Sequence, residues 1–143
     1  MLSFKKLKSR IKKNEGYSSI VYKDQLGFYT IGFGHLILPD EKKYFYYKYK
    51  KKHFEALFDK DFKKALFYYQ KLFYKRNHLK HERELIIEMI FQLGPKGVSK
   101  FKKMFFYLNK KQKYMTCLEM MDSLWYKQTP QRVHDLIKNF LGN

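Results

Sequence analysis

One stretch of this 143-residue chain, residues 17–38, has the pattern of short strands and tight turns, with helical patterns before and after it. Tyr22, Phe28 and Tyr29 favour strands, and residues 24–27, which read Asp-Gln-Leu-Gly, form a turn signal. A glycine on each side of Phe33 lets the backbone approach another surface closely. The stretch therefore predicts a small antiparallel sheet.

Elsewhere apolar side chains recur three and four positions apart, which is the spacing of one helix face. In residues 1–13 that face carries Phe4, Leu7 and Ile11. Thr129 and Pro130 predict the N-cap and first residue of a last helix. A helix start is also expected at Pro39-Asp40-Glu41. Further helices are expected over residues 54–74, 82–93, 98–108, 111–125 and 129–141. The pattern predicts a single α+β domain that is mostly helical.

The residue types exclude several kinds of site. Cys117 is the one cysteine, so an intramolecular disulfide is excluded, and we expect a small buried side chain rather than a thiolate metal site. The histidines show no ligand spacing, and no metal or cofactor is predicted. No run of about 18 uncharged apolar residues is present, so no membrane span is expected. The N-terminal residues do not resemble a signal peptide.

The formal net charge is +18, from 31 basic and 13 acidic residues. Only four of the basic residues are arginines, the residue that nucleic-acid readers use for bidentate contacts. Two interpretations of the charge stay open. A cationic surface can attract the protein to an anionic cell envelope, or the lysines can reflect coding bias alone.

Two carboxylates and a hydroxyl lie within sixteen residues of one another: Glu15 at the end of the first helical pattern, and Asp24 and Thr30 in the strand segment. Cleavage of a glycosidic bond needs one carboxylic acid that protonates the leaving oxygen and a second carboxylate that activates water. A hydroxyl beside the second group can hold that water. The three residues are therefore candidates for a glycosidase site.

The segments around these residues resemble the catalytic segment of the phage-type lysozymes, the endolysin family that includes the lysozymes of T-even coliphages. The shared steps are Asn14-Glu15-Gly16, Tyr22-Lys23-Asp24 and Tyr29-Thr30-Ile31-Gly32. A second block resembles the family's C-terminal lobe and comprises Phe91–Gly94, Gly97-Val98, Phe101 and Trp125–Arg132. The resemblance covers about residues 1–35 and 54–141. Residues 36–53 have no good counterpart.

The resemblance implies a two-lobed fold, with a β-containing lobe over about residues 14–60 and a helical lobe formed by residues 1–13 and 61–143. It implies that Glu15 is the general acid, that Asp24 and Thr30 orient the water, and that the reaction inverts the anomeric centre. It also implies a contact between His35 and Asp61 that anchors the sheet. Substrate-binding roles are implied for Phe91, Gln92 and Arg132.

Each implied binding role has a plainer alternative. Gln92 and Trp125 are expected to meet at the back of the cleft, or to be ordinary core residues. Arg132 is expected to contact the general acid, or to be a surface charge.

The implied function is that of an N-acetylmuramidase that cleaves the β-1,4 bond between N-acetylmuramic acid and N-acetylglucosamine in bacterial peptidoglycan. We expect a monomer that acts in phage-induced host lysis, first in the cytoplasm of the infected bacterium and then at the cell wall. The rival hypotheses are a bacterial effector, a virion-associated lysin or a chitin-cutting relative. A cationic protein that binds nucleic acid or damages membranes without catalysis is a further rival.

Overall fold

A computed structural model describes residues 3–142 of the chain. The chain forms two compact units, Met1–Leu66 and Phe67–Asn143. The α+β fold class is confirmed, because a small antiparallel sheet accompanies a large majority of helical residues. The expected grouping of residues 1–13 with the helical lobe stays a prediction.

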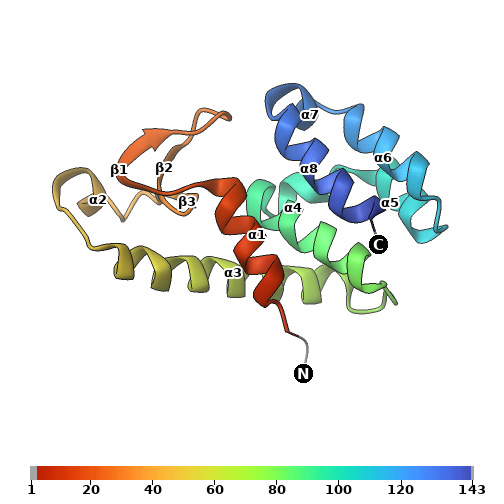
Figure 1. The fold of residues 1–143 in the computed structure, drawn as a ribbon, viewed down its shortest axis with the longest axis horizontal. Helices are drawn as coiled ribbons and strands as arrows, with labels where there is room; N and C mark the ends of the chain where they lie inside the picture. The colour runs from red at the N-terminus through yellow and green to blue at the C-terminus, as the bar shows by residue number, and fades with distance from the viewer. Residues whose placement is uncertain (1–2, 143) are drawn as a thin grey trace. The chain divides into compact units, whose positions relative to one another are not determined.

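The first unit holds the predicted sheet (Figure 1). Its three strands run antiparallel in the order β1-β2-β3, with Tyr22 opposite Thr30 and Ile31 opposite His35. The turn predicted at residues 24–27 joins β1 to β2. The elements of this unit are α1 (Lys5–Glu15), β1 (Ser18–Lys23), β2 (Tyr29–Gly32), β3 (His35–Leu36), α2 (Lys43–Tyr46) and the start of α3 (Lys51–Phe73).

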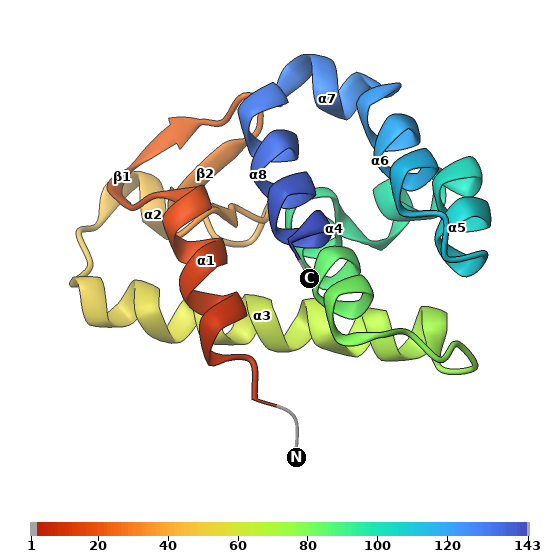
Figure 2. The same ribbon diagram turned by 45° about the vertical axis from the view of Figure 1, so that its right-hand side comes forward.

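The core of the first unit forms where α1 crosses α3, an arrangement visible in both ribbon views (Figures 1 and 2). Phe54, Phe58 and Phe62 are buried at a spacing of four residues, so they form one stripe of α3. Leu7 and Ile11 of α1 are also buried. The helical periods that predicted both helices therefore mark the buried faces.

The segment after the sheet differs from its prediction. Instead of a helix that starts at residues 39–41, only the four-residue helix α2 forms, and it begins at Lys43. The Glu41 carboxylate, which was expected in the first turn of a helix, accepts hydrogen bonds from the Leu38 N–H and from His35. The carboxylate thus stabilises the loop and the sheet and does not stabilise the N-terminus of a helix.

The regular elements of the second unit are all helices among its described residues. At its centre is α4 (Lys80–Ser99), in which six consecutive residues, 85–90, are buried. A backbone break at Gly94, where φ is +74°, precedes Pro95 and divides this helix. The remaining helices are α5 (Lys102–Asn109), α6 (Lys113–Met121), α7 (Leu124–Gln128) and α8 (Pro130–Leu141).

Three details of the helical prediction are wrong. Residues 111–125 form two helices, because the chain turns at residues 122–123 and Ser123 caps α7 by accepting a hydrogen bond from the Tyr126 N–H at 3.1 Å. The helix expected over residues 98–108 begins at Lys102, since residues 98 and 99 complete α4. Thr129 does precede α8, but its hydroxyl donates to the Trp125 carbonyl instead of capping the new helix.

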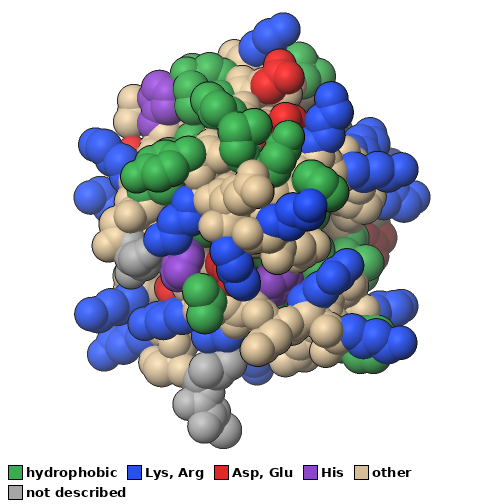
Figure 3. All heavy atoms as spheres, turned by 90° about the vertical axis from the view of Figure 1, so that its right-hand side faces the viewer, with side chains coloured by type: hydrophobic (Ala, Val, Ile, Leu, Met, Phe, Trp, Pro, Cys, Tyr) green, Lys and Arg blue, Asp and Glu red, His purple; other side chains and the backbone are tan. Residues whose placement is uncertain are grey.

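The surface combines lysines with exposed apolar side chains. On the face shown in Figure 3, apolar side chains gather among lysines. The exposed apolar residues of the second unit include Phe106, Tyr114, Leu118 and Leu124. Among the described residues no helix has both the length and the apolar character needed to cross a bilayer.

Candidate active site

Glu15 is the last residue of α1. The helix ends there because Gly16 adopts a φ of +72°, although its N–H still donates to the Lys12 carbonyl at 2.9 Å. An anion is disfavoured at a helix C-terminus by the helix dipole. Nevertheless the Oε1 atom of Glu15 is buried from solvent. A carboxylate in this unfavourable position indicates a function.

Gly34, in the turn between β2 and β3, forms the wall against which the Glu15 side chain lies. A Cβ atom added to Gly34 would stand 2.7 Å from Cδ and 2.9 Å from Cγ of Glu15 and would overlap Oε2. The close approach predicted for the backbone beside Phe33 is thus confirmed, and the surface approached is Glu15. The turn of the sheet thereby fixes the position of the carboxylate.

Asp24 begins the turn that joins β1 to β2. Its Oδ1 accepts hydrogen bonds from the N–H groups of Leu26 and Phe28, both at 2.9 Å. This is the usual role of an aspartate in a turn. Because both bonds use Oδ1, Oδ2 is left out of the turn's own hydrogen bonding. One oxygen orients the side chain, and the other can face a water or substrate.

Thr30 lies on β2 with 3% of its surface exposed. Its hydroxyl donates to the Phe28 carbonyl at 2.9 Å, and the same carbonyl accepts the N–H of Asp24 at 2.9 Å. The backbone of Phe28 therefore holds both Asp24 and Thr30. With its proton directed to Phe28, the Thr30 oxygen offers lone pairs to a further donor.

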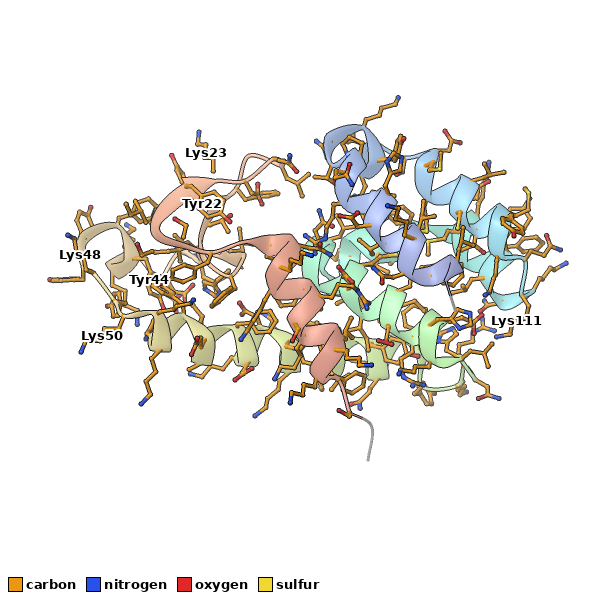
Figure 4. The ribbon with its side chains drawn as sticks, in the orientation of Figure 1. Tyr22, Lys23, Tyr44, Lys48, Lys50 and Lys111 are labelled. Carbon is orange, nitrogen blue, oxygen red and sulfur yellow. The ribbon has the colours of Figure 1, made fainter. Side chains whose placement is uncertain are left out.

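Tyr22 is influenced electrostatically by both carboxylates. It pairs with Thr30 across the sheet, and Figure 4 shows it on β1. Burial raises the pKa of Tyr22 above 10.0, and the negative charges of Glu15 and Asp24 raise it further. Both carboxylates are thus near enough to the same phenol to act on it electrostatically. The sequence pattern identifies Tyr22 only as a strand residue and as part of a motif.

His35 ties the sheet to α3. Its Nδ1 lies 2.8 Å from Oδ2 of Asp61, which confirms the predicted contact. Its Nε2 lies 2.8 Å from Oε1 of Glu41, a partner that was not foreseen. Burial lowers the pKa of His35, but the hydrogen bonds and charges of Asp61 and Glu41 outweigh burial and raise it above 6.5.

The three residues predicted to bind substrate lie in the second unit. The Gln92 side-chain oxygen accepts a hydrogen bond from the Trp125 ring N–H at 3.0 Å, so the predicted contact between these residues is confirmed. The Gln92 amide nitrogen lies 3.5 Å from the Thr129 hydroxyl. Phe91, the neighbour of Gln92, is half-buried. The substrate-binding roles of Phe91 and Gln92 stay predictions.

Arg132 projects from α8, and its Nε lies 3.5 Å from Oε2 of Glu88 on α4. Both side chains are strongly buried, with 10% and 1% of their surfaces exposed. The alternative of a surface charge is therefore wrong for Arg132. Its expected contact with Glu15 stays a prediction. Glu88 could not be anticipated, because its neighbours in sequence are apolar and suggest only a core helix.

Within residues 3–142 no group of three or more His, Cys, Asp or Glu side chains is arranged to hold a metal ion. The groups that the first unit offers for chemistry are two carboxylates, a hydroxyl and a phenol. These groups suit proton transfer and water activation.

Comparison with known proteins agrees with this arrangement. The sequence pattern of the family described as Phage lysozyme matches residues 12–139. Two relatives from Dictyostelium discoideum, named Probable T4-type lysozyme 2 and Probable T4-type lysozyme 1, are each 32% identical to this chain. The first alignment covers 94% of this chain and 92% of the relative, and the second covers 92% and 91%. The chain therefore belongs to the phage lysozyme family and is a lysozyme, a glycoside hydrolase of peptidoglycan.

Proposed function

We propose that the protein is an N-acetylmuramidase that hydrolyses the β-1,4 bond between N-acetylmuramic acid and N-acetylglucosamine, with Glu15, Asp24 and Thr30 as its catalytic residues. The observation that carries this assignment is that the first unit holds all three groups in place: Glu15 lies against the Gly34 backbone, and the Phe28 carbonyl accepts hydrogen bonds from both Asp24 and Thr30. Two carboxylates, one of them beside a hydroxyl, are the groups that hydrolysis of a glycosidic bond requires.

In the proposed mechanism Glu15 donates its proton to the bridging oxygen as the bond from that oxygen to the anomeric carbon breaks. A water molecule attacks the anomeric carbon from the opposite face, and its proton passes to Asp24. The Thr30 oxygen accepts a hydrogen bond from the same water, since its own proton points to the Phe28 carbonyl. Attack from the opposite face inverts the anomeric centre, which requires carboxyl groups roughly 6.5–9.5 Å apart.

The first experiment measures the clearing of a cell-wall suspension by Glu15→Gln and Asp24→Asn. General acid and base contributions are worth on the order of 10² to 10⁴ in rate, so each variant is expected to lose at least about a hundredfold in activity while remaining folded by circular dichroism. Asp59→Asn on α3 is a control that removes one negative charge from an exposed position of the same unit, where the carboxylate pairs with Lys8. Full activity in Glu15→Gln would refute the assignment.

The bond that is cleaved is tested by mass spectrometry of digested, purified peptidoglycan. Muramic acid at the new reducing ends supports a muramidase. Glucosamine ends or anhydro sugars would instead indicate a glucosaminidase or a transglycosylase. Proton NMR at early times distinguishes the α-anomer expected from inversion from the β-anomer produced by retention.

For the biological setting we propose phage-induced lysis, in which the enzyme accumulates in the host cytoplasm and reaches the wall after the inner membrane is breached. The two Dictyostelium relatives favour a second setting, in which a lysozyme of this family attacks bacterial walls outside any phage cycle. Expression of the protein in a bacterium tests the first of these two settings. The first setting predicts that cells lyse only when their inner membrane is permeabilised.

A further inference from the structure

Every residue of the segment 42–52 is either lysine or aromatic. It contains six lysines and five aromatic residues, and its sequence is Lys-Lys-Tyr-Phe-Tyr-Tyr-Lys-Tyr-Lys-Lys-Lys. This lysine–aromatic segment falls inside the stretch that has no good counterpart in the family resemblance. None of the proposed catalytic or substrate-binding residues comes from it. Its composition therefore needs an explanation other than catalysis.

Two of the five aromatic residues attach the segment to the first unit. Tyr44 is 5% exposed, and its hydroxyl lies 2.7 Å from Nε2 of His53. Tyr49 stacks on the His53 ring with centroids 4.6 Å apart and packs against Tyr44 at 5.2 Å. The segment is thereby fixed beside the start of α3, where both ribbon views show α2 (Figures 1 and 2).

The other three aromatic residues face solvent. Phe45, Tyr46 and Tyr47 are 47%, 79% and 69% exposed. The Phe45 ring packs edge-on against Tyr29, which is itself 50% exposed, so the exposed apolar surface extends onto the sheet. Large exposed apolar side chains that adjoin one another, unlike single ones, indicate an interaction site.

The six lysines of the segment are all exposed. Lys43 lies over the ring of Tyr44 at 5.3 Å, so its apolar stem follows aromatic surface while its ammonium group remains exposed. Lys48 and Lys50 extend away from the ribbon in Figure 4. Within residues 3–142 none of the six lysines forms an ion pair with a carboxylate. Their charges are available to an anionic partner.

We propose that the lysine–aromatic segment is a docking site for the surface of an anionic lipid bilayer. Tyrosine and phenylalanine rings enter the boundary between lipid head groups and acyl chains, where a tyrosine hydroxyl still reaches water. Lysines beside them meet the phosphates of acidic lipids, and each contributes to binding while it is within a Debye length of the surface. Exposed aromatic rings and lysines in one short segment are the combination that a peripheral membrane contact uses.

The arrangement of the rings favours a bilayer over a single-stranded nucleic acid. A protein that binds single strands spreads its stacking aromatic residues along a basic groove, so that successive bases find successive rings. Here the three most exposed rings come from three consecutive residues at the end of α2. The exposed rings are therefore gathered at one place instead of being spaced along a groove.

The test is cosedimentation of the full chain with two kinds of vesicle, phosphatidylcholine alone and phosphatidylcholine mixed with phosphatidylglycerol. We expect binding to the anionic vesicles and little binding to the neutral ones. The double variant Lys48→Gln/Lys50→Gln is expected to bind the anionic vesicles with an affinity that is lower by about tenfold. Tyr46→Ser/Tyr47→Ser is expected to lose about tenfold as well, through lost apolar burial. All four side chains are exposed, so both variants should fold.

Matched controls separate this segment from the overall charge. Lys100→Gln/Lys103→Gln removes the same charge from exposed positions in the second unit. Tyr114→Ser removes a ring that is 76% exposed on α6, close to the 79% of Tyr46. Both controls are expected to bind like the unmodified chain.

Equal loss in the controls would overturn the proposal, because it would assign binding to net charge or to general exposure. Absence of vesicle binding would also overturn it. So would vesicle binding that survives both segment variants, or an affinity for oligothymidine that the segment variants abolish while vesicle binding is unchanged.

Discussion

Gly34 lies directly against the Glu15 carboxylate, with no room for a Cβ atom between its backbone and that side chain. The residue proposed as the proton donor is therefore positioned by the backbone of a turn that follows it by nineteen residues. Backbone is a more rigid support than a second side chain, which would carry rotamer freedom of its own. This contact makes the activity depend on a residue that has no functional group.

Gly34→Ala is expected to reduce both stability and activity. The φ of Gly34 is +73°, a region that costs a residue with a Cβ about 1–2 kcal/mol. In addition, the new methyl group would displace the carboxylate, and misplaced catalytic groups lose on the order of a hundredfold in rate.

The measurement combines urea denaturation with the clearing rate of a cell-wall suspension. Gly94→Ala is the control, since φ there is +74° and a Cβ would meet nothing within 4 Å. Equal activity in the two variants would contradict the proposed support of Glu15.

The variants Thr30→Val and Thr30→Ser distinguish the effect of the Thr30 hydroxyl from the effect of the side chain's volume. Valine keeps the volume but loses the oxygen, and its rate is expected to fall by about a hundredfold or more if Thr30 holds the attacking water. It also loses the hydrogen bond to the Phe28 carbonyl, which costs about 1 kcal/mol of stability. Serine keeps the oxygen and should retain most of the activity. A valine variant with an unchanged turnover number at full saturation would exclude Thr30 from the reaction.

Much of this site was predictable because its information is local. The steps around Glu15, Asp24 and Thr30 lie within sixteen residues, and the turn at residues 24–27 follows from its own Asp and Gly. The buried partners of charged groups were not predictable in the same way. Glu41 as a second partner of His35, and Glu88 as the partner of Arg132, depend on contacts that no short pattern encodes.

The break between α6 and α7 illustrates the same limit in the fold. Apolar side chains continue at helical spacing across residues 111–125, which predicts one helix. Ser123 nevertheless ends the run, because its side chain satisfies the N–H of Tyr126 and starts a new helix. A serine inside a periodic pattern is compatible with either outcome, and tertiary packing decides between them.

The His35 cluster predicts a maximum of stability in mildly acidic solution. Because the pKa of His35 is raised in the folded state, its contribution is complete below 6.5 and is lost as the pH rises through the raised value. Burial raises the pKa of Glu41, but hydrogen bonds from Leu38 and His35 and the His35 charge lower it overall, below 4.5. Its contribution is therefore complete above 4.5 and is lost at lower pH. The cluster stabilises most between these two limits.

The measurement is urea denaturation of the unmodified chain and of Glu41→Gln across the pH range. The difference in unfolding free energy between them is expected to be about 1.5–3 kcal/mol between pH 4.5 and 6.5, the value of a hydrogen bond between charged groups. It should shrink in alkaline solution as His35 loses its proton. Asp59→Asn, which removes a carboxylate paired with Lys8 at the surface, should show no such decline. A difference that is constant from acid to alkali would rule out a charged His35.

Cys117 is expected to be nearly inert in the folded protein. Burial raises the pKa of its thiol to about 11, against a smaller opposing effect of the Lys113 charge. Only the thiolate reacts, and at pH 8 about one folded molecule in a thousand would carry Cys117 as a thiolate. Labelling with a disulfide reagent should therefore be at least about a hundredfold slower than in the urea-unfolded chain. Since this is the one cysteine, its labelling rate also reports unfolding. Fast labelling under native conditions would contradict the buried position.

Trp125 provides an optical test of its contact with Gln92, because it is the only tryptophan in the chain. Its ring is 4% exposed and its N–H donates to Gln92 at 3.0 Å. Gln92→Leu would leave this buried N–H without its acceptor, which is expected to cost about 1–3 kcal/mol and to shift the fluorescence emission. Gln92→Glu keeps an oxygen in place and should resemble the unmodified chain more closely in both measurements. If leucine and glutamate had the same effect, the contact would be ordinary packing, and the hydrogen bond would not fix the Trp125 ring.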